Sequence, residues 1–158
     1  MFHFIGFTCP ESTDPNYKVI DQTCYYFVST PKTFADAQSY CRTKFGSIKG
    51  MLAEPKTSQS VSALWTNARS IHSSPNFWIG MDDFKNRDGQ FRYSSSGVKV
   101  PSISGVTLEL DNNPSNEDCA RLRNTDYIED QTCSTLYSSI CEASITGTTN
   151  GSDFFNLN

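Results

Sequence analysis

The sequence of 158 residues predicts one α+β domain, in which two helices are followed by a largely antiparallel sheet. Three observations carry this prediction. Apolar residues recur at helical spacing in two segments between residues 33 and 68, apolar runs of strand length follow from residue 77, and no internal repeat interrupts the pattern. With 37% hydrophobic and 13% aromatic residues, the chain has enough apolar bulk to form a core.

The first half of the chain predicts one strand and two helices. Residues 24–28 are aromatic and β-branched and lead into a Ser-Thr-Pro turn, as expected of a buried strand. Thr33 is the expected N-cap of the first helix, and Gly46 marks its end. Its apolar positions are Phe34, Ala37, Cys41 and Phe45. The second helix starts after a cap at Thr57 or Ser58. Its apolar stripe consists of Val61, Leu64, Trp65 and Ala68.

The second half predicts strands and one long loop. Residues 77–81 form an apolar run of strand length, and residues 91–93 and 98–100 alternate like the two arms of a hairpin. Residues 101–118 combine Pro, Ser, Gly and Asn with acidic residues, which predicts a long loop that is either functional or mobile. Three short strands are expected at residues 119–122, 127–129 and 138–142.

Composition and motifs exclude several classes of function. The formal net charge of -4 and the absence of a Lys/Arg run argue against a nucleic-acid partner. No apolar stretch approaches the roughly 18 residues of a membrane-spanning helix, so no membrane insertion is expected. Gly-x-Ser-x-Gly and His-Glu-x-x-His motifs are absent, and His3 and His72 lie in a terminal segment and a Ser-rich loop. The sequence therefore predicts a binding protein and not an enzyme.

Six cysteines predict three disulfides in an oxidising compartment. They are Cys9, Cys24, Cys41, Cys119, Cys133 and Cys141. No CxxC pair is present and only two histidines could join them, so a zinc site is not expected. Their spacing alone leaves the pairing open. Secretion is the expected localisation, and the sequon at Asn150 agrees with a glycoprotein.

Taken in order, these segments resemble the C-type lectin-like domain family. The resemblance rests on Cys9-Pro10, on Cys24-Tyr-Tyr-Phe27, on Phe77-Trp-Ile-Gly80, on Glu117-Asp-Cys119 and on Ile140-Cys-Glu142. It implies a domain over residues 9–142, between an N-terminal segment of residues 1–8 and a tail or linker of residues 143–158. It also implies the disulfides Cys9–Cys24, Cys41–Cys141 and Cys119–Cys133.

The resemblance further implies a glycan site in the long loop, where family members coordinate sugar hydroxyls through calcium. The matching positions are Asn113, Ser115, Glu117, Glu129 and Asp130. Carboxylates and amides are the hard oxygen ligands that calcium prefers, so Glu117, Glu129 and Asp130 are the expected metal ligands. Asn113 and Ser115 depart from the usual motif, and the spacing from Pro114 to Cys119 is compressed. Solvated loop residues are the alternative explanation of all these groups.

A second, loop-ordering calcium position is expected at Asp83, Asp88, Glu117 and Asp118, although the pair Asp82-Asp83 equally suits a turn. A site without metal is a third alternative. Its candidates, on or beside strands that would face a ligand, are Tyr127, Asn124, Arg121 and Arg123. The alternative for the two arginines is that they lie on the solvent face for solubility alone. The sequence thus predicts a secreted lectin that binds glycans or glycoproteins. The alternative is a calcium-independent module that binds a protein or another non-sugar partner, and oligomer formation stays open.

Overall fold

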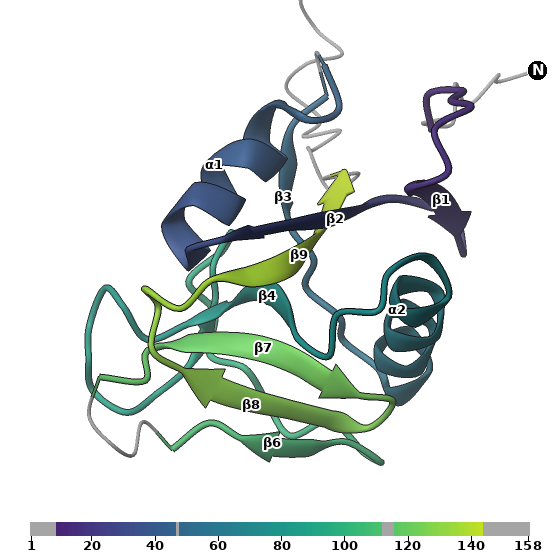
Figure 1. The fold of residues 1–158 in the computed structure, drawn as a ribbon. Helices are drawn as coiled ribbons and strands as arrows, with labels where there is room; N and C mark the ends of the chain where they lie inside the picture. Colours follow the sequence, from purple (N-terminus) through teal and green to yellow (C-terminus); the bar gives the residue numbers. More distant parts are fainter. Residues whose placement is uncertain (1–8, 47, 112–115, 144–158) are drawn as a thin grey trace, which may run out of the picture.

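The central feature of the fold is a sheet of nine strands within the described part of the chain (Figure 1). The structure is a computed structural model that describes residues 9–46, 48–111 and 116–143. The strands are β1 (Tyr17–Ile20), β2 (Thr23–Lys32), β3 (Gly50–Leu52), β4 (Phe77–Asp82), β5 (Arg92–Tyr93), β6 (Thr107–Glu109), β7 (Cys119–Asn124), β8 (Tyr127–Gln131) and β9 (Tyr137–Ala143). The helices are α1 (Phe34–Thr43) and α2 (Ser58–Ile71). The two-helix α+β class predicted from the sequence is confirmed.

The strands run in the order β1-β2-β9-β4-β7-β8-β6, while β3 pairs with β9 and β5 pairs with β4. Most pairs are antiparallel, as predicted, but β4 with β9 and β6 with β8 are parallel. Three strands were not predicted: β1, β3 and β6. Strands β3 and β6 have three residues each, too few to show a period, and β6 lies inside the segment predicted as a loop.

Side-chain caps fix the starts of both helices. Thr33 caps α1, since its hydroxyl accepts the N–H of Asp36 at 3.2 Å. Thr57, one of the two predicted candidates, caps α2 through a reciprocal capping box with Ser60. Helix α1 ends at Thr43, so Phe45 lies beyond it. No helix among the described residues is long and apolar enough to cross a membrane.

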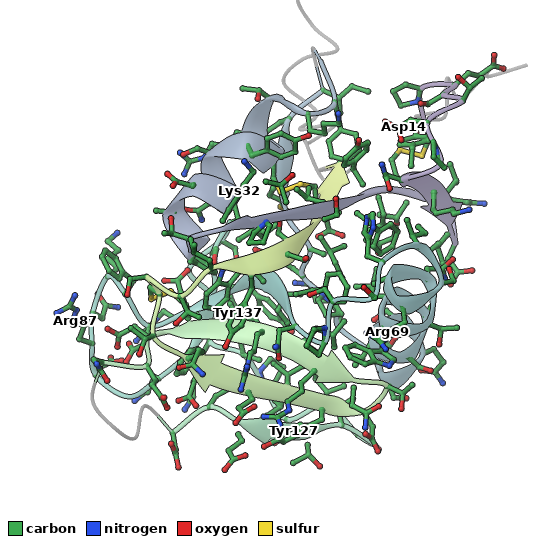
Figure 2. All side chains as sticks on the ribbon, in the orientation of Figure 1. Asp14, Lys32, Arg69, Arg87, Tyr127 and Tyr137 are labelled. Carbon is green, nitrogen blue, oxygen red and sulfur yellow. A yellow bond between two sulfur atoms is a disulfide. The ribbon has the colours of Figure 1, made fainter. Side chains whose placement is uncertain are left out.

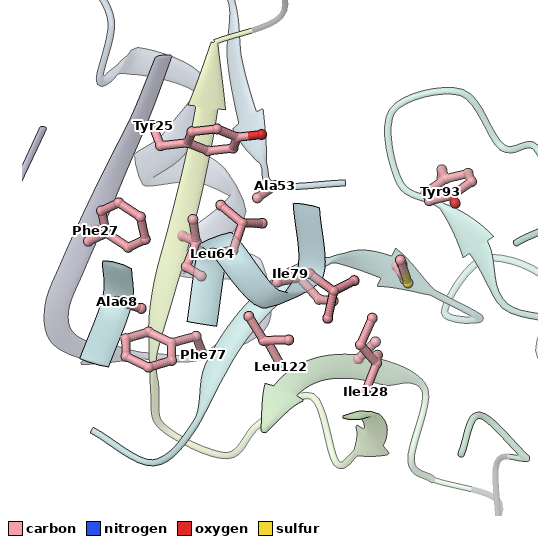
Figure 3. Packing of buried hydrophobic residues seen from close by; sticks show 14 of the residues in the cluster. Tyr25, Phe27, Ala53, Leu64, Ala68, Phe77, Ile79, Tyr93, Leu122 and Ile128 are labelled. Atoms are coloured by element: carbon pink, nitrogen blue, oxygen red, sulfur yellow. The ribbon is translucent and has the colours of Figure 1, made fainter. Parts of the chain in front are cut away.

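Two hydrophobic clusters lie on opposite faces of the sheet because neighbouring strand residues point to opposite sides. Phe77 and Ile79 of β4 join Leu64 of α2 in one cluster (Figure 3), whereas Trp78 joins Phe34 of α1 in the other. Each helix therefore covers one face. Beyond β4, the face on the α1 side continues onto β7 and β8 with polar residues.

Three disulfides secure the fold with the pairing that the resemblance implied: Cys9–Cys24, Cys41–Cys141 and Cys119–Cys133. Their sequence separations are 15, 100 and 14. In the chain-entropy picture, loops of these lengths are each stabilised by about 3 to 5 kcal/mol. The second disulfide ties α1 to β9, and the third joins β7 to the segment that follows β8.

Candidate functional site

The candidate site lies on the α1-side face of β7 and β8, opposite the hydrophobic cluster that α2 covers. Leu122 and Ile128 pair in register and belong to the core cluster. Arg121 and Glu129, each adjacent to one of them, also pair in register and therefore lie on the opposite face. Figure 2 looks onto this part of the sheet, with Tyr137 beside β7 and Tyr127 towards β6. We call it the outer face.

Arg121, Glu129 and Arg123 form an arginine–glutamate centre on the outer face. Glu129 Oε2 accepts Nη2 of Arg121 and Nη1 of Arg123, both at 2.8 Å. Nη1 of Arg121 also donates to Asn76 Oδ1 at 2.9 Å and to the Tyr137 hydroxyl at 2.7 Å. Because Arg121 is only 7% exposed, its guanidinium is a fixed and desolvated charge. The suggestion that Arg121 serves solubility alone is therefore wrong.

The electrostatics of the centre keep Glu129 ionised. Partial burial raises the pKa of this carboxyl, but the guanidiniums of Arg123 and Arg121 outweigh that effect and hold the pKa below its ordinary value. Arg123 remains half exposed, with 50% of its side chain accessible. The outer face thus presents an accessible guanidinium beside an ionised carboxylate.

Aromatic rings flank this centre. Tyr137 packs under the Arg121 guanidinium, 5.2 Å from the ring centroid, and its ring lies 4.9 Å from that of Trp78. On the other side, the Tyr127 hydroxyl donates to Glu109 of β6. A cation, a carboxylate and aromatic rings on one face form a surface suited to polar ligands with apolar patches.

The structure separates the predicted long-loop residues. Asp130 pairs with Ala120 of the core cluster and is only 4% exposed, so it lies on the face opposite Glu129. Glu117 is partly buried; burial raises the pKa of its carboxyl, and the negative charge of Glu129 adds to the effect. Asn113 and Ser115 lie outside the described residues.

Of the residues of the second predicted calcium position, Asp83, Asp88 and Asp118 lie near the turn after β4, and no hydrogen bond or ion pair joins the Glu117 side chain to them among the described residues. Asp83 accepts the backbone N–H groups of Asp88 at 3.2 Å and Gly89 at 2.7 Å, which shapes the turn. Arg92 pairs with Asp88 at 2.9 Å and holds the pKa of that carboxyl well below its usual range. Asp118 is buried, and its Oδ2 lies 3.5 Å from Nε of Arg87. These contacts agree with the turn that the sequence offered as the alternative.

As arranged, the described acidic side chains do not fit a calcium ion on the outer face. Calcium takes about six to eight oxygen ligands. Glu129 Oε2 is instead shared by two guanidiniums, and Asp130 faces the core. Within the described ranges, no group of three or more His, Cys, Asp or Glu side chains could hold a metal ion.

Sequence reasoning missed three residues of the outer face: Asn76, Tyr137 and Glu109. Asn76 precedes β4 and Tyr137 begins β9, so they lie 45 and 16 residues from their shared partner Arg121. No local spacing links residues so far apart. An arginine pair alternating along a predicted strand was the one available signal, because it places both guanidiniums on one face.

Comparisons with known proteins agree with this architecture. A family model described as Lectin C-type domain matches residues 30–143. An alpha-N-acetylgalactosamine-specific lectin of Patiria pectinifera is 30% identical over 146 residues, which cover 87% of this chain and 84% of that protein.

Solved structures share the fold at lower identity. The C-type lectin CEL-I from Cucumaria echinata has a TM-score of 0.72 at 20% identity, covering 85% of this chain and 99% of that one. A structure titled Ca2+-dependent type II antifreeze protein, in a Ca2+-free form, has a TM-score of 0.64 at 19% identity over 86% of this chain and all of that one. Proteins of one fold thus carry different functions.

Proposed function

The chain belongs to the C-type lectin family, and from this premise we propose that it binds glycans through the outer face of β7 and β8. The observation that carries the proposal is the 30% identity with a lectin named for alpha-N-acetylgalactosamine, over most of the length of both chains. The proposed ligand is a terminal hexose or N-acetylhexosamine, and N-acetylgalactosamine is the first sugar to test.

The groups on the outer face suit the hydroxyls of a neutral sugar. The accessible guanidinium of Arg123 has five N–H donors, of which one is given to Glu129. The Glu129 carboxylate, whose side chain is 21% exposed, accepts hydrogen bonds from hydroxyl groups. The partly exposed ring of Tyr127 offers an apolar face for the C–H side of a sugar ring.

Sugar binding at this face does not require calcium in our proposal. In place of a metal, Arg121 and Arg123 balance the charge of Glu129, and Arg121 is itself held by Asn76 and Tyr137. The calcium roles predicted from the family resemblance give the opposite expectation. They concern Glu117, Glu129 and Asp130, with Asp83, Asp88 and Asp118 at the second position.

We also propose that the protein is extracellular and has no enzymatic activity. Three disulfides suit an oxidising compartment, where they persist. The C-type lectin family is a family of binding domains, and its partners here would be glycans or glycoproteins. Whether the chain forms oligomers is best measured by light scattering on the purified protein.

The test is calorimetric titration with N-acetylgalactosamine, preceded by a glycan array, each with calcium and with chelator. We expect saturable binding whose affinity changes less than about twofold on chelation, since about 0.4 kcal/mol is within the error of such titrations. Loss of binding on chelation would refute calcium independence and support the predicted metal ligands. No glycan signal in either condition would refute the lectin proposal and leave the protein-binding alternative.

Paired variants test the location of the site. Arg123→Met is expected to weaken sugar binding at least tenfold, because it removes the accessible donor of the outer face. Arg42→Met is the matched control, since Arg42 is an exposed arginine in the last turn of α1. Equal affinities for the Arg123→Met variant and the unmodified protein would show that the sugar site does not lie on the outer face.

A further inference from the structure

A cavity in the described part of the chain is separate from the outer face. It has a volume of about 820 Å³ and lies between the ends of β2, β3 and β9, the segment that leads into α2, and the loop after β5. Small-molecule sites in proteins have volumes of about 300 to 1,000 Å³. None of its lining residues belongs to the arginine–glutamate centre.

Two buried glutamates line this cavity. Glu142 of β9 pairs in register with Tyr25 and Met51, and Glu54 follows β3. They are 9% and 5% exposed, and the backbone N–H of Glu54 donates to Glu142 Oε1 at 3.0 Å. Ser95 fixes Glu54 through its backbone N–H at 2.8 Å and its hydroxyl at 2.7 Å. Buried acids are rare because ionised carboxylates lose hydration, so they call for a counter-charge.

Two tyrosines form aromatic walls beside these acids. Tyr25 on β2 and Tyr93 on β5 both line the cavity and are 8% and 3% exposed. The buried hydroxyl of Tyr93 has no hydrogen-bond partner among the described residues. Aromatic faces next to carboxylates form a surface that attracts cations.

Lys56 of the chain itself places an ammonium between Tyr93 and Glu54, a position that we call the corner of the cavity. Its ammonium lies 3.3 Å from the centroid of the Tyr93 ring and 3.7 Å from Glu54 Oε1. The Lys56 side chain is nevertheless 60% exposed, so the ammonium is reached from solvent at the mouth of the cavity. Lys99 is the other lysine of the lining, but within the described residues neither lysine forms a salt bridge with Glu142.

We propose that this cavity is a second ligand site, for a small organic cation that carries a primary ammonium on an apolar body. The ammonium of the ligand lies between the Glu54 and Glu142 carboxylates beside the Tyr93 ring, so it serves both charges, and its apolar body packs against Tyr25 and the apolar part of the lining. Lys56 occupies the corner in the free protein, and the ligand displaces it. The site is independent of glycan binding on the outer face.

The experiment is calorimetric titration of the full chain with phenethylamine at pH 8, with 2-phenylethanol as the neutral analogue. At this pH Glu142 is ionised, because burial and the charge of Glu54 raise its pKa to about 7 and no further. We expect millimolar binding of the amine and at least tenfold weaker binding of the alcohol. Equal binding of the two compounds would overturn the proposal, because the cavity would then recognise only the apolar body and not the ammonium.

Three variants separate the roles of the residues. Lys56→Met is expected to tighten amine binding about fivefold, because it removes the internal competitor, whereas Lys85→Met, at an exposed lysine outside the cavity lining, leaves binding unchanged. Glu142→Gln is expected to weaken it about tenfold, and urea unfolding of this variant shows whether it is folded. Absence of amine binding in both the unmodified protein and the Lys56→Met variant refutes the site. Glycan binding measured in parallel distinguishes that failure from failure of the lectin proposal.

Discussion

Glu142→Gln is expected to stabilise the protein at alkaline pH and to leave its stability unchanged in acid. Burial, reinforced by the negative charge of Glu54, raises the pKa of Glu142 from an ordinary 4.5 to about 7 in the folded protein. As pH rises, the unfolded chain therefore loses this proton first. The free energy of unfolding falls from about pH 4.5 to about pH 7, and the loss is complete above that range.

The magnitude follows from the two pKa values. Each pKa unit corresponds to about 1.4 kcal/mol, so ionised Glu142 lowers the stability at pH 8 by about 3 kcal/mol relative to the protonated form. Glutamine keeps an acceptor for the Glu54 N–H, which now donates at 3.0 Å, and it carries no charge to desolvate. The variant should therefore lack this loss.

Urea unfolding with intact disulfides, followed by tryptophan fluorescence at pH 4, 6 and 8, measures the effect. The variant should exceed the unmodified protein by nearly nothing at pH 4, by about 2 kcal/mol at pH 6 and by about 3 kcal/mol at pH 8. Glu11→Gln, at an exposed glutamate, is the matched control and should give the same small difference at every pH. A Glu142→Gln difference that does not change with pH would refute the reasoning.

Three further predictions concern the outer face and the packing around it. Arg121→Met should lower the free energy of unfolding by about 3 kcal/mol in urea titrations, because it breaks a buried charge pair, whereas Arg123→Met at the exposed partner should cost less than about 1 kcal/mol. Gly80→Ala should destabilise by about 1 to 3 kcal/mol, since its methyl group would lie 2.7 Å from a backbone oxygen of β3; thermal unfolding would show no shift if the strands can separate. Replacing Cys119 and Cys133 together by alanine should cost about 3 kcal/mol in the same urea assay, and an unchanged midpoint would contradict the loop-entropy argument.

Local patterns determined the helices and the longer strands. The helical period and the caps at Thr33 and Thr57 give the starts of α1 and α2 because a cap acts within one turn. The run at residues 77–81 gives β4, since it is buried on both faces. Strand β6 was not predicted because three residues are too few to show a period. It is stabilised by pairing with β8, which begins 18 residues after β6 ends.

The candidate site was only partly predictable, and Glu129 and Asp130 show why. Adjacent acids in a sequence suggest one ligand set, but a strand turns neighbouring side chains to opposite faces. Asp130 therefore faces the core, while Glu129 meets Arg121, which pairs with it in register. Family resemblance supplied the acids at these positions, and it could not show that two arginines would neutralise one of them.

The sequence by itself determined the family, the α+β class and, through the family resemblance, the pairing of the cysteines, because order and spacing along the chain carry that information. Only the tertiary structure decided what surrounds each charge. Glu142 meets Glu54 across 88 residues, and Arg121 meets Asn76 across 45, so both environments depend on strand pairing that no local segment specifies. The outer face and the cavity lined by Glu54 and Glu142 exist because distant segments, each with an ordinary composition, bring their polar groups to one place.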